Sequence, residues 1–213
     1  MSGPRVSYAH AARLPDGTEP VPIASLHPGG WSGPVEIEIG PGRGGFLFER
    51  AASAPDALIL GFEIRRKWAH IVNERLVKAG LHPRVQCLAE NALVALPRLR
   101  GSARAVFLHF PDPWWKKRHE KRLVMGDVLL DEVARLLPPG GELFVQTDVE
   151  ERATQYREQI ASHTAFAPRG DLEGSPTLAE NPYAARSHRE HRAIADGLPI
   201  HRMRFVRRGG DAP

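Results

Sequence analysis

The stretch Ala105-Val-Phe-Leu-His-Phe-Pro-Asp-Pro-Trp-Trp-Lys-Lys-Arg-His-Glu-Lys-Arg122 joins a predicted strand to a carboxylate and a cationic run. Its first part, Ala105 to Phe110, is an apolar run rich in β-branched and aromatic residues, which is typical of a strand buried on both faces of a parallel sheet. Pro111 and Pro113 end the strand, because proline cannot donate to a ladder and stiffens the chain. The pattern therefore predicts Asp112 on a rigid support at the carboxyl end of a strand, where open α/β sheets bind ligands.

The residues after this turn are suited to contact a nucleic acid. Trp114 and Trp115 are followed by five lysines and arginines between positions 116 and 122. Flat aromatic surface and cationic side chains beside a carboxylate are the groups that hold a base and its phosphates. A basic run is also typical of a solvated face, and Trp114 could be a core residue, so the run alone leaves both interpretations open.

Length and composition limit the class of protein. The chain has 213 residues, 42% of them hydrophobic, which suits one α/β domain with a short extension. The sequence contains no apolar run long enough to span a membrane and no segment typical of a signal peptide, so we expect no membrane partner and a cytoplasmic location. Cys87 is the single cysteine, which excludes an internal disulfide and fits a reducing compartment.

The charge of the chain is unevenly distributed. A net charge of +4 and a pI near 9.6 give a mild preference for polyanions. Residues 111–122 carry five lysines and arginines against two acids, and residues 186–208 carry seven arginines against two acids. These two segments are the candidates for contact with a polyanion.

Apolar periodicity predicts alternating strands and helices along most of the chain. Residues 1–33 are rich in Pro, Gly and Ser and are interpreted as an irregular or partly disordered arm before one domain at 34–208. Strands are expected at 35–39, 57–63, 84–88, 105–110, 142–147 and 200–206, and helices at 46–54, 66–79, 92–96, 124–137 and 149–163. This alternation predicts an α/β fold with a doubly wound, mostly parallel sheet and a late antiparallel strand.

A glycine-rich turn, Gly40-Pro-Gly-Arg-Gly-Gly45, follows the first predicted strand. Glycine there lets the backbone approach a ligand at the N-terminus of the next helix. The spacing, with Glu63 downstream, fits a dinucleotide fingerprint as well as an S-adenosylmethionine site. Glu38 favours the second, because its charge suits an ammonium or sulfonium group rather than a pyrophosphate. Glu63, at the end of the second strand, could accept both ribose hydroxyls.

Together these motifs resemble the bacterial tRNA (guanine-N7-)-methyltransferase family over about Val35 to Val206. The motifs are Ile37-Glu-Ile-Gly-Pro-Gly-Arg-Gly44, Gly61-Phe-Glu63, the Phe110–Arg122 segment, and Thr147-Asp148 with Tyr156. The glycine turn is generic, whereas Pro-Asp-Pro-Trp with the following basic segment is highly specific. The resemblance implies a Rossmann-like class I methyltransferase that transfers a methyl group from S-adenosylmethionine to N7 of a variable-loop guanine in tRNA.

The resemblance also implies roles for individual residues. It assigns the cofactor site to Glu38, Gly40, Gly42, Glu63, Asn91 and Asp112, with Asp112 as the active-site carboxylate, and the substrate site to Lys116, Asp148, Ser187 and Glu190. The last two belong to Ser187-His-Arg-Glu190, which corresponds to the family's Thr-x-x-Glu motif. Asn91 stands where the family usually has Asp, so an adenine contact would use an amide oxygen. Ser187 stands where the family has Thr and keeps the hydroxyl.

The chemistry of guanine limits what these residues must do. Guanine N7 carries an in-plane lone pair and no proton, so no general base is needed and alignment is the main task. Asp112 is therefore interpreted as the acceptor for the guanine N1–H and N2–H edge, and Asp148 could share that task.

Other interpretations remain at this point. His188 and His191 have helical spacing, but nothing completes a set of ligands, so we expect no metal. Cys87 is expected in the core, and Tyr156 is either a packing residue or a ligand contact. The alternatives are a methyltransferase acting on a small molecule or protein, a non-catalytic RNA-binding module on this fold, and an NAD-dependent dehydrogenase. The sequence does not distinguish a monomer from a homodimer.

Overall fold

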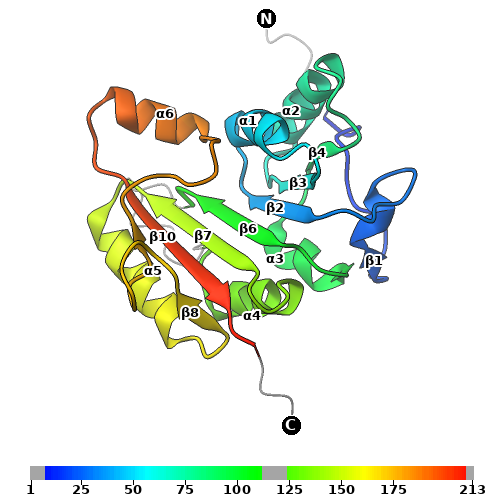
Figure 1. The fold of residues 1–213 in the computed structure, drawn as a ribbon. Coiled ribbons are helices and arrows are strands. Elements are labelled where there is room, and N and C mark those ends of the chain that lie inside the picture. Colours follow the sequence, from blue (N-terminus) through cyan, green and yellow to red (C-terminus); the bar gives the residue numbers. More distant parts are fainter. Residues whose placement is uncertain (1–7, 112–123, 210–213) are drawn as a thin grey trace, which may run out of the picture.

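The computed structural model describes residues 8–111 and 124–209, which are built around one large sheet (Figure 1). It is an eight-stranded sheet with the order β4-β3-β2-β6-β7-β10-β8, and β9 pairs with β10 off this path. The strands are β2 (Val35–Ile39), β3 (Leu58–Phe62), β4 (Val85–Leu88), β6 (Ala105–His109), β7 (Glu142–Thr147), β8 (Phe166–Pro168), β9 (Thr177–Leu178) and β10 (His201–Arg207). Strands β2, β3, β4, β6 and β7 are parallel and β10 is antiparallel to β7, which confirms the predicted fold class.

The order of the strands changes direction at β2. From β2 the chain moves outward through β3 to β4 and then returns to the other side of β2 for β6 and β7. In open α/β sheets such a reversal leaves a crevice outside the carboxyl ends of the two flanking strands. The topology therefore places the expected ligand site at the carboxyl ends of β2 and β6.

Helices cover both faces of the sheet. On one side lie α1 (Gly45–Ser53), α2 (Arg66–Lys78) and α6 (His188–Ala195), and on the other lie α3 (Ala92–Ala95), α4 (Asp127–Leu136) and α5 (Glu150–Ser162) (Figure 1). The alternating β2 sequence serves both faces, because Ile37 and Ile39 join the core shared with α4 and α5 while the glutamates point to the α1 side. Among the helices of the described ranges, none combines the length and apolarity needed to cross a bilayer.

The segment before β2 is irregular but packs on the domain. It contains β1 (Val21–Pro22) and the 3-10 helix η1 (Ile23–Leu26), and β1 pairs in parallel with β5 (Leu99–Arg100), which follows the 3-10 helix η2 (Leu96–Arg98). The buried side chains of Leu14, Val21 and Ile23 belong to the same apolar core as β2. This packing joins residues 8–33 to the sheet domain.

Some boundaries differ from the predicted ones for local reasons. β6 ends at His109, because Phe110 has a φ angle of 49° and leaves the extended conformation. α4 begins at Asp127 and not at 124, after an extended Gly126. The helix α6 and the short strands β1, β5, β8 and β9 were not predicted.

Candidate active site

The turn between β2 and α1 requires glycine at three positions. Gly40, Gly42 and Gly44 have φ angles of 72°, 56° and 77°, a region that other L-residues rarely adopt. At Gly44 a Cβ atom would also lie 2.8 Å from Cγ1 of Val72 in α2. At Gly40 a Cβ atom would meet open space, so the backbone there can be approached by a ligand. The turn thus packs tightly on α2 and is open at the end of β2.

Glu63 follows β3 and is held against the glycine turn. Its side chain is buried; Oε2 accepts a hydrogen bond from the backbone N–H of Gly42 at 2.9 Å, and Oε1 accepts one from the backbone N–H of Arg65 at 2.9 Å. The Arg65 guanidinium also donates to Oε1 at 3.1 Å. Oε1 therefore accepts two hydrogen bonds, whereas Oε2 accepts one and keeps a further lone pair for a hydroxyl donor. The structure thus brings together two predicted cofactor residues, Gly42 and Glu63, and a contact with ribose stays a prediction.

The two glutamates of β2 are buried in different surroundings. Glu36 accepts hydrogen bonds from Arg50 and Arg104, each at 2.8 Å, so its charge is balanced. Glu38 contacts His109, with 2.8 Å between Oε1 and Nδ1 of the imidazole. Its second oxygen, Oε2, is buried and has no hydrogen-bond partner in the part of the chain that the structure describes. An orphaned buried carboxylate oxygen is rare in a native protein, and a bound ligand would explain it.

The electrostatics of Glu38 suit a cationic ligand. Burial raises the pKa of Glu38 above that of an ordinary carboxyl group, because desolvation disfavours the charged form, whereas the contact with His109 acts in the opposite direction. The charge of Glu63 adds to the increase in pKa. A cation at Oε2 would stabilise the carboxylate form and offset part of the cost of burial.

The segment of residues 105–122 begins with β6 and continues beyond the end of this strand. Phe110 adopts a left-handed conformation that is unusual for a bulky residue, and its backbone N–H donates to the carbonyl oxygen of Gln146 in β7 at 2.7 Å. Pro111 follows. Asp112, Lys116 and the rest of the basic run lie outside the described residues, so their roles stay predictions.

Asn91 follows β4 at the same edge of the sheet and begins α3. Its Oδ1 accepts a hydrogen bond from the backbone N–H of Leu93 at 3.1 Å, which makes it the N-cap of this short helix. The neighbouring Glu90 accepts from the backbone N–H of Leu14 at 3.2 Å and pairs with Arg13. An adenine contact by Asn91, which stays a prediction, would therefore use its amide nitrogen or the second lone pair of Oδ1.

Asp148 follows β7 and forms an ion pair with Arg189 of α6. The Asp148 side chain is 7% exposed, whereas that of Arg189 is 37% exposed. The structure thus places Asp148 at the predicted edge of the sheet, with its charge already compensated. A contact between Asp148 and the substrate stays a prediction, and any group that approaches it meets Arg189 as well.

Ser187 and Glu190 anchor the helix α6. The Ser187 Oγ atom accepts a hydrogen bond from the backbone N–H of Glu190 at 3.1 Å, as an N-cap does. Glu190 is fully buried and accepts hydrogen bonds from Gln146 at 2.8 Å, Asn181 at 3.0 Å and Arg202 at 3.0 Å. These bonds tie α6 to β7 and β10. The substrate contacts that the resemblance implies for both residues stay predictions.

The start of α6 lies directly against the glycine turn. A Cβ atom at Gly45 would be 2.8 Å from the backbone nitrogen of His188. Segments that are more than 140 residues apart in the sequence therefore meet beside the end of β2. Their proximity makes the anchoring of α6 relevant to the shape of the site.

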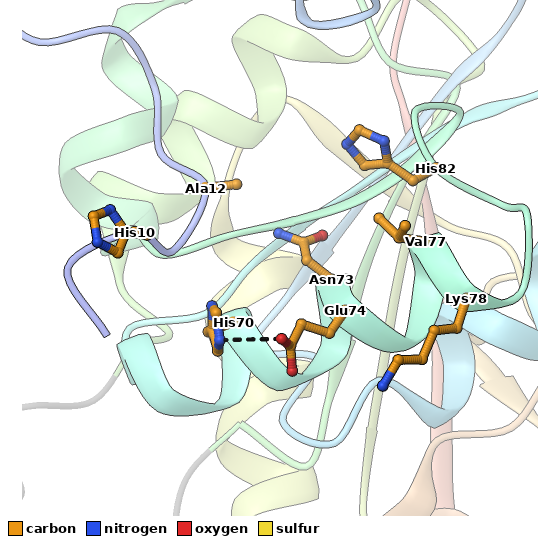
Figure 2. A pocket seen from close by; sticks show the side chains of 8 residues that line it. All are labelled: His10, Ala12, His70, Asn73, Glu74, Val77, Lys78 and His82. Atoms are coloured by element: carbon orange, nitrogen blue, oxygen red, sulfur yellow. Dashed lines mark ion pairs between the residues drawn. The ribbon is translucent and has the colours of Figure 1, made fainter. Parts of the chain in front are cut away.

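A separate hollow of about 330 Å³ lies beside α2. It is lined by His10 and Ala12 of the N-terminal segment and by His70, Asn73, Glu74, Val77, Lys78 and His82 (Figure 2). His70 and Glu74 form an ion pair of 3.6 Å on the side of α2 that faces this hollow (Figure 2). The hollow contains none of the predicted cofactor or substrate residues, so the glycine turn and not this hollow is the candidate site.

Other residues that the sequence singled out lie in the core or in ion pairs. Cys87 and Tyr156 are buried in the core, as expected for a packing cysteine, and burial raises the pKa of the Cys87 thiol well above its usual value. His191 contacts Glu49 at 2.5 Å. Within residues 8–111 and 124–209, no group of three or more His, Cys, Asp or Glu side chains is placed to hold a metal ion.

Sequence reasoning missed two residues of this region, His109 and Arg189. His109 was included in an apolar strand, although a polar residue near the end of a buried run, two positions before Pro111, was an available signal. The helix that carries Arg189 was missed as well. The Ser-x-x-Glu spacing at 187–190 is that of a capping box and could have predicted its start.

Comparisons with known proteins identify the family of the chain. A family model described as a putative methyltransferase matches residues 32–203. A protein of Myxococcus xanthus named tRNA (guanine-N(7)-)-methyltransferase is 34% identical over 180 residues, which cover 84% of this chain and 85% of that protein. A protein of Anaeromyxobacter dehalogenans with the same name is 37% identical over 180 residues, which cover 82% of this chain and 86% of that protein.

Solved structures show the same fold at low sequence identity. TrmN from Thermus thermophilus superposes with a TM-score of 0.59 at 18% identity, covering 82% of this chain and 44% of that one. The 16S rRNA (adenine(1408)-N(1))-methyltransferase from Catenulisporales acidiphilia, solved with its cosubstrate SAM, gives a TM-score of 0.55 at 14% identity, covering 84% and 88%. The fold is thus that of class I S-adenosylmethionine-dependent methyltransferases. With its motifs and its identity to the curated relatives over most of its length, the chain belongs to the tRNA (guanine-N(7)-)-methyltransferase family.

Proposed function

We propose that this protein transfers a methyl group from S-adenosylmethionine to N7 of a guanine in the variable loop of tRNA. The structural observation that carries the proposal is the buried Oε2 atom of Glu38, which lacks a partner among the described residues and lies at the strand end that leads into the open glycine turn. Family membership supports the same conclusion. Because the substrate is tRNA, we expect the protein to act in the cytoplasm.

The residues at the ends of β2, β3 and β4 fit this cofactor. When bound, S-adenosylmethionine supplies a methyl group on a positively charged sulfur. Glu38 would hold the ammonium group with its free oxygen, and Gly40 and Gly42 would let the backbone come close. Glu63 would accept the ribose hydroxyls, and Asn91 would contact the adenine from the end of β4.

The residues after β6 and β7 would hold the tRNA. Guanine N7 has no proton to lose, so the protein has to align the base rather than deprotonate it. Asp112 would accept from the guanine N1–H and N2–H groups and stabilise the positive charge of the methylated ring, and Asp148 would support it from the end of β7. Lys116 and the adjoining basic residues would bind phosphates. The arginine paired with Asp148, Arg189, is exposed enough to meet the same substrate.

Methyl transfer to bulk tRNA tests the proposal directly. The purified protein is incubated with methyl-labelled S-adenosylmethionine and unmodified tRNA, and the RNA is digested to nucleosides. The expected product is 7-methylguanosine. A different modified nucleoside, or transfer to a protein or small molecule instead, would contradict the substrate. Binding of tRNA without transfer would indicate a non-catalytic module, and binding of NAD in place of S-adenosylmethionine would indicate a dehydrogenase.

Affinity for S-adenosylmethionine should fall as the pH is lowered from neutral into the mildly acidic range. Because burial raises the pKa of Glu38, this carboxylate takes up a proton at a higher pH than an exposed glutamate does. The protonated form has no charge for an ammonium group, so the stabilisation is present above the raised pKa and lost below it. Calorimetric titrations at a series of pH values measure the effect. The Glu38→Gln variant should bind S-adenosylmethionine more weakly, and its affinity should depend less on pH. An unchanged pH dependence in this variant would contradict the role of Glu38 in binding the cofactor.

Glu63→Gln should weaken cofactor binding by roughly tenfold, because hydrogen bonds to a charged group contribute about 1.5–3 kcal/mol and the amide is a weaker acceptor. The matched control is Glu132→Gln in α4, which removes a carboxylate paired with Arg135 on the other face of the sheet. Titration calorimetry compares the two variants with the wild type. If both bound S-adenosylmethionine as the wild type does, Glu63 would not belong to the cofactor site.

A further inference from the structure

His109 is a buried residue that the proposed function leaves without a role. It is the last residue of β6, the strand beside β2 at the point where the strand order reverses, and it is 6% exposed. Its Nδ1 atom lies 2.8 Å from Oε1 of Glu38, whereas its Nε2 atom is buried without a hydrogen-bond partner in the described ranges. A core histidine usually has both ring nitrogens satisfied. Here the imidazole forms a hydrogen bond with the Glu38 carboxylate through Nδ1, and Nε2 is left over.

Three aromatic rings hold the imidazole in place. The ring of Phe46 in α1 lies 4.4 Å from it between centroids, and the rings of Phe107 in β6 and Phe144 in β7 each lie 5.9 Å away. Because these rings belong to three elements and are themselves buried, the imidazole cannot turn without repacking its surroundings. His109 is thus a donor whose direction is fixed before any ligand arrives.

This arrangement determines which oxygen of Glu38 is available. The Nδ1–H group donates to Oε1, since an unprotonated nitrogen 2.8 Å from a carboxylate oxygen would repel it. The other oxygen, Oε2, is left for a different partner. The neighbouring Glu36 shows the contrast, because arginine side chains donate to both of its oxygens.

We propose that His109 is a positioning residue for the cofactor: by donating from Nδ1 it orients the Glu38 carboxylate so that Oε2 faces the cationic amino-acid end of S-adenosylmethionine. The inference rests on the proposed function for the identity of the cofactor. It requires that His109 acts through Glu38 and changes the affinity for the cofactor, not the rate of transfer from bound cofactor.

Two substitutions separate the hydrogen bond from the packing. His109→Asn keeps a donor near the position of Nδ1, and His109→Leu fills a similar volume without a donor. His109→Leu should raise the dissociation constant for S-adenosylmethionine about tenfold, the usual scale for a hydrogen bond to a charged group. It should raise KM for the cofactor and leave kcat nearly unchanged, because the lost interaction serves binding. His109→Asn should restore most of the affinity.

The control and a double variant make the test specific. His163→Leu removes a similar contact, from His163 to Asp131 at 3.1 Å at the end of α5, and should leave cofactor affinity unchanged. In a Glu38→Gln background, His109→Leu should add no further loss, because the carboxylate that it orients is gone. A loss that persists in that background, or equal losses for the Asn and Leu variants, would overturn the inference.

Two further measurements separate this inference from the proposed function. If His109→Leu does not fold, His109→Gln takes its place. The amide nitrogen of glutamine lies one bond farther from the backbone than that of asparagine, so His109→Gln should not restore the affinity that His109→Asn restores. Calorimetry on the wild type without tRNA establishes whether S-adenosylmethionine binds at all. No binding would overturn both the function and the inference, whereas normal binding by the wild type and by His109→Leu would reject the role of His109 alone.

Discussion

Glu190→Ala is expected to lower the free energy of unfolding by about 3–5 kcal/mol, the range found when one partner of a buried ion pair is removed. Glu190 is fully buried and accepts hydrogen bonds from Gln146, Asn181 and Arg202. Arg202 is itself 8% exposed, so alanine would leave a buried guanidinium without its carboxylate. The Gln146 amide would lose its acceptor, whereas the Asn181 amide would keep the carbonyl oxygen of Ala185. Denaturant unfolding followed by circular dichroism measures the loss.

The matched control is Glu158→Ala, which removes an exposed glutamate from α5 and should change stability by less than about 0.5 kcal/mol. Adding Arg202→Met to Glu190→Ala should cost less than the sum of the two single variants, because it removes the unpaired charge. If Glu190→Ala were no more destabilising than Glu158→Ala, the anchoring role of Glu190 in α6 would be rejected. A contact with tRNA would then be the remaining explanation for a glutamate at this position.

Much of the fold could be predicted because the local signals agree with the packing. In β2 the apolar residues Ile37 and Ile39 face one core while Glu36 and Glu38 face the other side, so a strict alternation appears in the sequence. The glycine turn was equally visible, since its left-handed residues accept little besides glycine. The position of Glu63 beside this turn then follows from two adjacent parallel strands that end together.

The pairing of polar groups could not be predicted, because it depends on register between distant segments. His109 meets Glu38 only because β6 lies beside β2, 71 residues away in sequence. Arg189 meets Asp148 across 41 residues. It belongs to α6, whose mostly polar sequence gives no clear apolar side from which the packing of the helix could be predicted. The partners of Glu190 could not be predicted for the same reason, because its donors come from β7, β10 and the loop before α6. The substrate contact that the resemblance implies for Glu190 stays a prediction.

Asp112→Asn is expected to reduce turnover by roughly a hundredfold or more, the scale found when one preorganised electrostatic contact to a reacting group is lost. The amide keeps the shape of the side chain but can turn a donor toward the N1–H and N2–H donors of guanine. It also removes a negative charge near the ring that becomes cationic on methylation. Asp112 lies beyond the described end of β6, so this prediction rests on its sequence motif and on the strand that leads to it.

Binding should be largely preserved in this variant, which distinguishes a catalytic loss from a structural one. Cofactor affinity should survive, because Glu38 and Glu63 would carry most of that contact. Affinity for tRNA should change little, because phosphate contacts dominate it. The matched control, Asp56→Asn, removes an exposed aspartate just before β3, at the opposite edge of the sheet, and should keep full activity.

Single-turnover methylation with saturating tRNA and cofactor isolates the chemical step from binding and product release. A hundredfold slower step with unchanged binding is the result expected if Asp112 holds the guanine. A rate near that of the wild type would reject this role and transfer it to Asp148, which the structure places after the neighbouring strand β7 in contact with Arg189. In that case Asp148→Asn, measured in the same way, should show the loss, because a guanine aligned for attack through N7 still needs an acceptor for its N1–H and N2–H edge.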